Sequence, residues 1–159
     1  MTEEHKKSFI KMNFDLETKS QEKGLFKGYA SIFDEVDSQN DRVVRGAFQK
    51  SLQQAINAGQ MPKMLWQHNE KELIGLWTTI REDAKGLYVE GKLLTDVVKA
   101  KEAHALIQEK ALDGLSIGYI VKQALRGKER GAVRLLTEVE VLEISLVTFP
   151  ANAGARISN

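Results

Sequence analysis

Residues 114–119 place a serine between two glycines, in a stretch that otherwise has the pattern of a buried strand. Leu115 and Ile117 alternate with smaller residues, as expected for one face of a strand. Because glycine weakens the interior of a strand, paired glycines indicate a bulge or a point where a ligand or another backbone approaches closely. The Ser116 hydroxyl is therefore a candidate nucleophile. The alternative is a small residue that fills a tightly packed sheet.

A serine hydroxyl needs a base to accept its proton, and histidine is the usual base because it titrates near neutral pH. The sequence offers three histidines. His5 lies in a charged terminus, and His104 is expected near the edge of the apolar stripe of a helix. His68 follows Trp66 at the end of a predicted strand and beside the polar residues 69–72, a position typical of functional residues. We therefore take His68 as the candidate base; the alternative is a structural histidine.

A third group should fix the tautomer of the imidazole and stabilise its charged form. Glu143 is expected on the same face of the last long strand as Val139, Val141 and Ser145. A buried carboxylate without a partner is costly, so Glu143 on this face needs one. It is the candidate third member of a triad. The alternative is a structural ion pair with an arginine such as Arg134.

Residues 114–118 also match the G-x-S-x-G nucleophile elbow of α/β-hydrolases. In that fold a helix follows the serine and the histidine comes later in the chain. Here residues 119–121 are strand-like, no histidine follows Ser116, and repeated βα units are missing. We interpret the match as coincidental.

Composition narrows the possible functions. The chain has 159 residues and no cysteine, which excludes disulfides, a thiolate nucleophile and cysteine-ligated metals. Its net charge of +1 gives no basic surplus for a phosphate backbone, so nucleic-acid binding is a weak hypothesis. We found neither the apolar core of a signal peptide nor an apolar run of membrane-spanning length. We expect one soluble, intracellular domain over residues 1–159, with residues 1–7 flexible.

Hydrophobic periodicity predicts about seven strands and two helices, in an α+β fold: a small, mostly antiparallel β-barrel or highly curved sheet, with the helices packed outside. The strands are expected at residues 9–16, 25–33, 63–68, 73–80, 86–94, around Ser116, and at 134–149. The helices are expected at residues 47–58, ending at Gly59, and at 97–112, capped by Thr95 or Asp96. Residues 34–42 hold four acids but lack the glycine and terminal glutamate of an EF-hand, so a solvated loop is favoured over a calcium loop.

The order histidine, serine, acid along such a chain resembles the prohead (capsid maturation) proteases of tailed bacteriophages, which are related in fold to the herpesvirus assemblins. The resemblance covers most of the chain, through residues 28–33, 41–48, 66–68, 74–75, 86–87, 115–119 and 142–152. It implies that His68 is the base, Ser116 the nucleophile and Glu143 the acidic third member. Family members commonly have aspartate where this chain has Asn69, and glycine where it has Asn40. Neither departure removes a proposed catalytic group.

The resemblance implies a serine endopeptidase that cleaves scaffold and major capsid protein segments, and itself, inside the procapsid in the cytoplasm of a bacterial host. It implies self-association, and it implies no metal, organic cofactor, nucleic acid or membrane. Proteases of this family often carry a carboxy-terminal extension, which we expect to be absent from this chain. We expect backbone amides of the loop at residues 126–131 to stabilise the oxyanion. Two alternatives remain: a catalytically silent barrel that acts as a capsid scaffold or assembly partner, and a barrel that binds nucleic acid or a small ligand.

Overall fold

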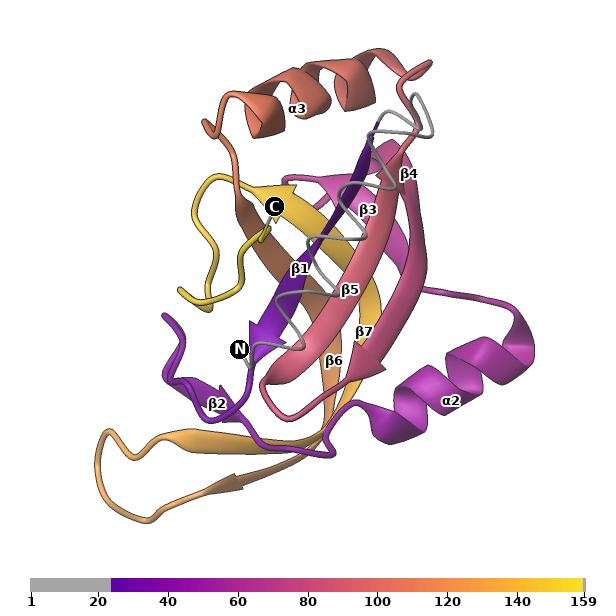
Figure 1. The fold of residues 1–159 in the computed structure, drawn as a ribbon. Coiled ribbons are helices and arrows are strands. Elements are labelled where there is room, and N and C mark those ends of the chain that lie inside the picture. The colour runs from indigo at the N-terminus through magenta and orange to yellow at the C-terminus, as the bar shows by residue number, and fades with distance from the viewer. Residues whose placement is uncertain (1–23, 159) are drawn as a thin grey trace.

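The computed structural model describes residues 24–158; the predicted strand at 9–16 and the terminal residues 1–7 lie outside this range. Within it are seven strands and two helices (Figure 1). In chain order these are β1 (Leu25–Ile32), β2 (Asp41–Val43), α2 (Gln49–Ala58), β3 (Lys63–Trp66), β4 (Asn69–Glu82), β5 (Gly86–Leu93), α3 (Val98–Gln108), β6 (Gly114–Arg126) and β7 (Arg134–Val147).

The strands form a single mixed sheet that curls into an open half-barrel, in the order β1-β5-β4-β3-β7-β6. Strand β2 pairs with residues 134–136 of β7, whereas β3 pairs with residues 143–146 of the same strand. Because β6 runs along one edge of β7, β2 and β3 share the other edge. Both pair with β7 in parallel, whereas the remaining pairs are antiparallel. The predicted barrel is thus an open half-barrel rather than a closed one, and within residues 24–158 the strands and their mostly meander order are largely confirmed.

The gap between β1 and β6 is occupied by the carboxy-terminal residues 155–158 rather than by a direct pairing of the two strands. Isolated bridges join Gly28 to Ile157 and Gly114 to Arg156. The Tyr29 amide donates to the Arg156 carbonyl at 3.1 Å. Gly28 permits this approach, since a Cβ there would lie 2.2 Å from the Arg156 carbonyl oxygen. The carboxy-terminal segment therefore holds together the two edge strands of the half-barrel.

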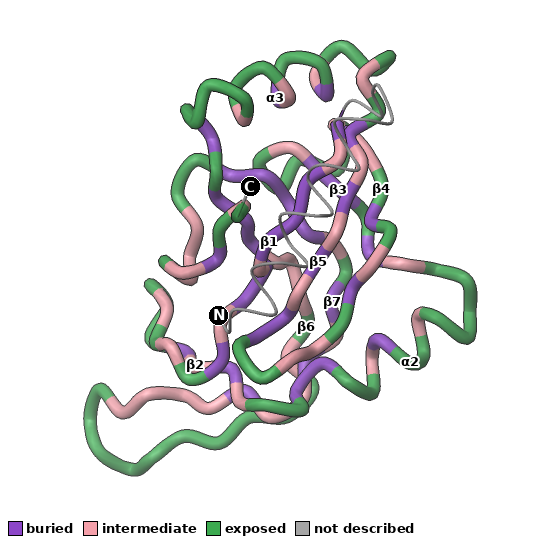
Figure 2. Tube along the Cα trace, viewed as in Figure 1, coloured by how far each residue is buried: buried purple, intermediate pink, exposed green. Residues whose placement is uncertain are grey.

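Buried positions of the strands and of both helices contribute to one hydrophobic core (Figure 2). Helix α2 buries Leu52 and ends at Gly59, whose positive φ of 65° confirms the predicted stop. Helix α3 is shorter than predicted and begins without a side-chain cap, so the expected capping by Thr95 or Asp96 is wrong.

A β-bulge in β7 reverses the predicted assignment of faces along that strand. Tyr119 of β6 pairs with Val141, but the preceding Gly118 pairs with Glu143. Leu142 is therefore an extra residue without a partner on β6, and the alternation of side chains changes face after it. Glu143 consequently lies on the face opposite to Val141, not on the same face as predicted.

Candidate active site

Four residues on β6 and β7 share the face of the sheet that points away from the core. Ser116 lies directly opposite Ser145, and Gly118 lies directly opposite Glu143. Side chains at directly opposite positions are close neighbours, with Cβ atoms ~5 Å apart. The β-bulge that moves Glu143 off the core face thus brings it onto the face of Ser116.

The two glycines around Ser116 make room for neighbouring atoms, as their placement in the sequence predicted. A Cβ on Gly118 would lie 2.2 Å from Glu143 Oε1, so the Glu143 side chain lies across this glycine. A Cβ on Gly114 would lie 2.4 Å from the Val147 carbonyl oxygen. Gly118 therefore leaves the space in which the Glu143 carboxylate lies against β6.

His68 lies in the two-residue turn between β3 and β4, and not on β3 as predicted. Trp66 pairs with Asn69 across the turn, and both intervening residues have positive φ, 52° at Gln67 and 59° at His68. This is the backbone of a type I′ hairpin, which non-glycine residues adopt only at a cost. The His68 amide donates to Ser145 Oγ at 3.0 Å, which ties the turn to β7.

The side chain of Gln67 holds the other side of the turn. Its Nε2 donates to Thr148 Oγ1 at 2.8 Å, and its Oε1 accepts from the Thr148 amide at 3.2 Å. The strained turn is therefore fixed at both residues to the carboxy-terminal end of β7. This arrangement sets the position of the His68 ring.

The His68 ring is hydrogen-bonded through Nδ1 to Glu143 Oε1. The hydrogen bond with Glu143 is the main cause that raises the pKa of His68 above its usual 6.5; partial burial opposes it and the charge of Glu143 adds to it. In the neutral ring, a proton on Nδ1 leaves Nε2 unprotonated and able to accept a proton. The other carboxylate oxygen, Oε2, accepts a 2.6 Å hydrogen bond from Ser145 Oγ.

Ser116 and His68 line one cavity of about 200 Å³. Ser116 is mostly buried, with 8% of its surface exposed, while Phe149 at the same cavity is 90% exposed. Among residues 24–158, the Ser116 hydroxyl makes no hydrogen bond with His68. In unliganded enzymes such catalytic hydrogen bonds are often long and tighten when substrate binds.

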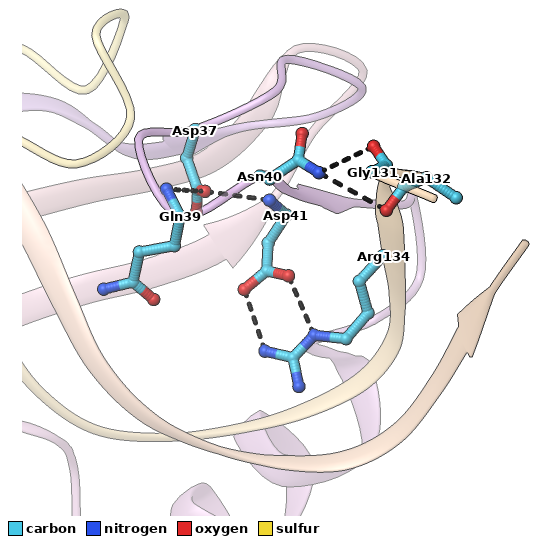
Figure 3. Close-up of polar contacts among 7 residues, drawn as sticks. All are labelled: Asp37, Gln39, Asn40, Asp41, Gly131, Ala132 and Arg134. Atoms are coloured by element: carbon cyan, nitrogen blue, oxygen red, sulfur yellow. Dashed lines mark hydrogen bonds and ion pairs between the residues drawn. The ribbon is translucent and has the colours of Figure 1, made fainter. Parts of the chain in front are cut away.

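The loop before β2 contributes Asp37 and Gln39 to the lining of the same cavity, and β2 contributes its first residue, Asp41. Asp41 is only 2% exposed and makes a bidentate ion pair with Arg134, with both N–O distances 2.8 Å (Figure 3). Arg134 is therefore not the partner of Glu143, which was the alternative to a catalytic role. The pKa of Tyr119 is raised mainly by burial and further by the charges of Asp37 and Asp41, while Arg134 opposes the shift.

The loop at residues 126–131 does not lie beside Ser116, which corrects the expected source of oxyanion donors. Gly114 pairs with Val147 at one end of the β6–β7 hairpin, and this loop closes the other end. It is absent from the lining of the cavity that holds Ser116. At the end of the 126–131 loop, the Gly131 and Ala132 carbonyls accept hydrogen bonds from Asn40 Nδ2 at 3.2 and 3.3 Å (Figure 3). These bonds hold the loop before β2, which contains Asn40.

Other candidates from the sequence lie elsewhere. His104 lines a separate cavity between α3 and β1, and His5 lies outside the described residues. Ser145 and Gln67 were not identified from the sequence as residues that hold the turn carrying His68. Ser145 carried one usable signal, a hydroxyl between Ile144 and Leu146 in an otherwise apolar segment.

Within residues 24–158, no three histidine or acidic side chains are grouped so that they could hold a metal ion. No helix in that range is long and apolar enough to cross a membrane.

Comparison with known proteins gives a family match over nearly the whole chain. Residues 13–159 match the model of the family described as Caudovirus prohead serine protease. A protein named "Prohead protease" from Enterobacteria phage HK97 is 36% identical over 138 residues, which is 85% of this chain and 59% of that protein. The chain thus spans less than two thirds of this relative.

Two further similarities are more distant. A "Capsid polyprotein" from Pseudomonas phage PAJU2 is 37% identical over 101 residues, 60% of this chain and 15% of that protein. Among solved structures, the varicella-zoster virus protease matches with a TM-score of 0.48 and 12% identity, over 84% of this chain and 62% of that one.

Proposed function

This chain belongs to the Caudovirus prohead serine protease family, and we propose that it is a serine endopeptidase with Ser116 as nucleophile, His68 as base and Glu143 as the group that orients His68. The observation that carries the proposal is the hydrogen bond between Glu143 and His68 Nδ1, made beside the cavity that Ser116 and His68 both line. A carboxylate bonded to one nitrogen of a histidine, with a serine lining the same cavity as that histidine, is the combination of groups that a catalytic triad requires.

In the proposed reaction, Ser116 Oγ attacks the scissile carbonyl carbon while His68 Nε2 accepts the hydroxyl proton. Glu143 remains ionised and stabilises the imidazolium that forms. The imidazolium then donates its proton to the leaving amine, which yields an acyl-enzyme on Ser116. A water molecule, deprotonated by the same ring, hydrolyses the acyl-enzyme and restores the serine.

The proposed substrates are extended segments of the major capsid protein and of scaffold, together with this chain itself, cleaved inside the procapsid. The family description and the names of the phage relatives support this assignment. By analogy with the herpesvirus assemblins, we also propose that the protease self-associates and becomes more active when it is concentrated. Activity per chain that stays constant over a wide dilution series would contradict that part of the proposal.

The test is co-expression of the chain with the capsid and scaffold proteins of its own phage, followed by intact mass measurement. The unmodified chain is compared with Ser116→Ala, and with Ser51→Ala as a control for loss of a hydroxyl. Ser51 lies on α2, where its Oγ donates to the Phe48 carbonyl at 3.2 Å.

We expect cleavage products with the unmodified chain and with Ser51→Ala, and none with Ser116→Ala. Products that form equally with Ser116→Ala would rule out Ser116 as the nucleophile. Capsids that assemble with no cleavage by any form would favour the silent scaffold.

A further inference from the structure

Ser145 is completely buried, yet its hydroxyl makes two hydrogen bonds that both concern the triad. It donates to Glu143 Oε2 at 2.6 Å, and it accepts from the His68 amide at 3.0 Å. One oxygen atom therefore contacts both the carboxylate and the backbone of the base. Directly across the β6–β7 pair, the residue opposite Ser145 is Ser116.

We propose that Ser145 is a positioning residue that aligns Glu143 and His68 with each other and holds both beside Ser116. This inference rests on the proposed function, because it assigns a role within the same triad. Ser145 itself does not touch the reacting atoms.

The carboxylate of Glu143 needs an anchor of this kind. Three rotatable bonds separate it from the backbone, and it must present one particular oxygen to Nδ1 of His68. The hydrogen bond from Ser145 occupies Oε2 and leaves Oε1 directed at the ring. Across the strand, Gly118 leaves the space that the carboxylate fills. Removal of the Ser145 hydroxyl frees the carboxylate to rotate, while the room around it stays the same.

The turn that carries His68 needs an anchor as well. Its positive φ at Gln67 and His68 is unfavourable for residues with side chains. Ser145 Oγ accepts a hydrogen bond from the backbone amide of His68. The hydroxyl that orients Glu143 therefore also fixes the backbone position from which the His68 ring projects.

The experiment measures the ionisation of the His68 ring by NMR, with its signal assigned by its loss in His68→Gln. It is carried out in the Ser116→Ala background, so that it does not depend on catalysis or on autocleavage. Ser145→Ala removes the hydroxyl, and Ser145→Cys keeps a side chain of similar size with a weak donor. Ser51→Ala is the matched control. The surrounding charges, Lys63 beside Glu143 and the acids Glu35, Asp37 and Asp41 at the cavity, are unchanged in all variants.

We expect the pKa of His68 to fall toward 6.5 in both Ser145 variants and to stay unchanged in Ser51→Ala. An unchanged His68 pKa in Ser145→Ala would overturn the proposal. So would a Cys variant that titrates like the unmodified side chain while Ala does not, since packing would then explain the effect. If Ser145→Ala does not fold, an unchanged His68 pKa in Ser145→Cys would overturn the proposal.

With Ser116 restored, loss of this hydrogen bond to a charged group should lower kcat about 10- to 100-fold and leave KM nearly unchanged. A loss confined to KM would contradict a positioning role. The two ideas fail separately: cleavage that persists in Ser116→Ala removes the proposed function, whereas the titration of His68 still reports whether Ser145 positions the pair.

Discussion

Gly118 lies opposite Glu143 on the neighbouring strand, and the Glu143 carboxylate occupies the space where a Gly118 side chain would be. Gly118 is therefore required by the position of the Glu143 side chain and not by Ser116. Residues on two strands, far apart in the chain, are matched in size at this point. The match lets the carboxylate reach the turn that carries His68.

Substitution of Gly118 by alanine should disconnect Glu143 from His68. The new Cβ would lie 2.2 Å from Glu143 Oε1, so the carboxylate must move. A misplacement of about 1 Å in a catalytic group can lower the rate ~100-fold, and we expect a loss of kcat of that order. Kinetic assay of Gly118→Ala tests this.

Gly127→Ala is the control for Gly118→Ala. Its new Cβ would meet Glu129 Oε2 at 3.0 Å and Ala132 Cβ at 3.2 Å, within the exposed hairpin loop where a flexible side chain can move aside. We expect it to retain full activity. Equal activity of Gly118→Ala and the unmodified chain would mean that the observed carboxylate position is not needed for turnover.

The raised pKa of His68 predicts opposite effects of pH on activity and on stability. Only the neutral ring can accept the Ser116 proton, so activity should rise with pH through the raised pKa and have its acid limb above pH 6.5. Stability behaves in the reverse sense. Because Glu143 favours the protonated ring in the folded state, its contribution is complete below pH 6.5 and is lost as the pH rises through the folded pKa.

Glu143→Gln tests both effects, because it keeps the size of the side chain and removes its charge. The acid limb of the kcat/KM profile should move to lower pH, and the maximal rate should fall. In denaturant unfolding, the difference in stability between the two proteins should be larger at pH 5 than at pH 9. A profile whose acid limb stays in place would indicate that another group controls it.

Gly28→Ala should loosen the carboxy-terminal segment from β1. The added Cβ would lie 2.2 Å from the Arg156 carbonyl oxygen, which is backbone and cannot rotate away. Residues 155–158 would have to shift, and the bridge between Gly28 and Ile157 would break. We expect faster amide exchange at Tyr29, whose hydrogen bond to Arg156 depends on this contact, while Gly127→Ala leaves it unchanged. Unaltered exchange at Tyr29 would show that the segment accommodates the methyl group.

The candidate residues could be predicted from the sequence because few residues in this chain can perform acyl transfer. A serine between glycines, a histidine expected at a strand end and an acid expected on an apolar face made Ser116, His68 and Glu143 the candidates, and their roles in catalysis stay a prediction. Alternation with a period of two also located most strands. These features are local, so a single sequence displays them.

The geometry of the site could not be predicted, since it depends on contacts between strands. Residues 139–147 carry apolar side chains at both odd and even positions, so the β-bulge at Leu142 has no signature in the sequence. The turn at Gln67 and His68 lacks the Asn-Gly or Asp-Gly pair that indicates a type I′ hairpin. Its positive φ values are held by contacts with Ser145 and Thr148, both distant in the chain.

The ion pair between Asp41 and Arg134 gives a stability prediction that is independent of the triad. Arg134→Gln leaves a carboxylate that is 2% exposed without its two 2.8 Å hydrogen bonds, which should cost about 3 kcal/mol in the free energy of unfolding. Lys122→Gln is the control, because Lys122 and Glu140 form an exposed pair at 3.1 Å that should contribute less than about 1 kcal/mol.

Urea unfolding of the two variants measures this difference, and Asp41→Asn combined with Arg134→Gln should recover part of the loss by removing the buried charge. Since Asp41 lines the cavity with Ser116, the single Arg134 variant should also raise KM for peptide substrates. Equal stabilities of Arg134→Gln and Lys122→Gln would mean that the loop at residues 37–41 is held by its remaining contacts, chiefly Asn40 with Gly131 and Ala132.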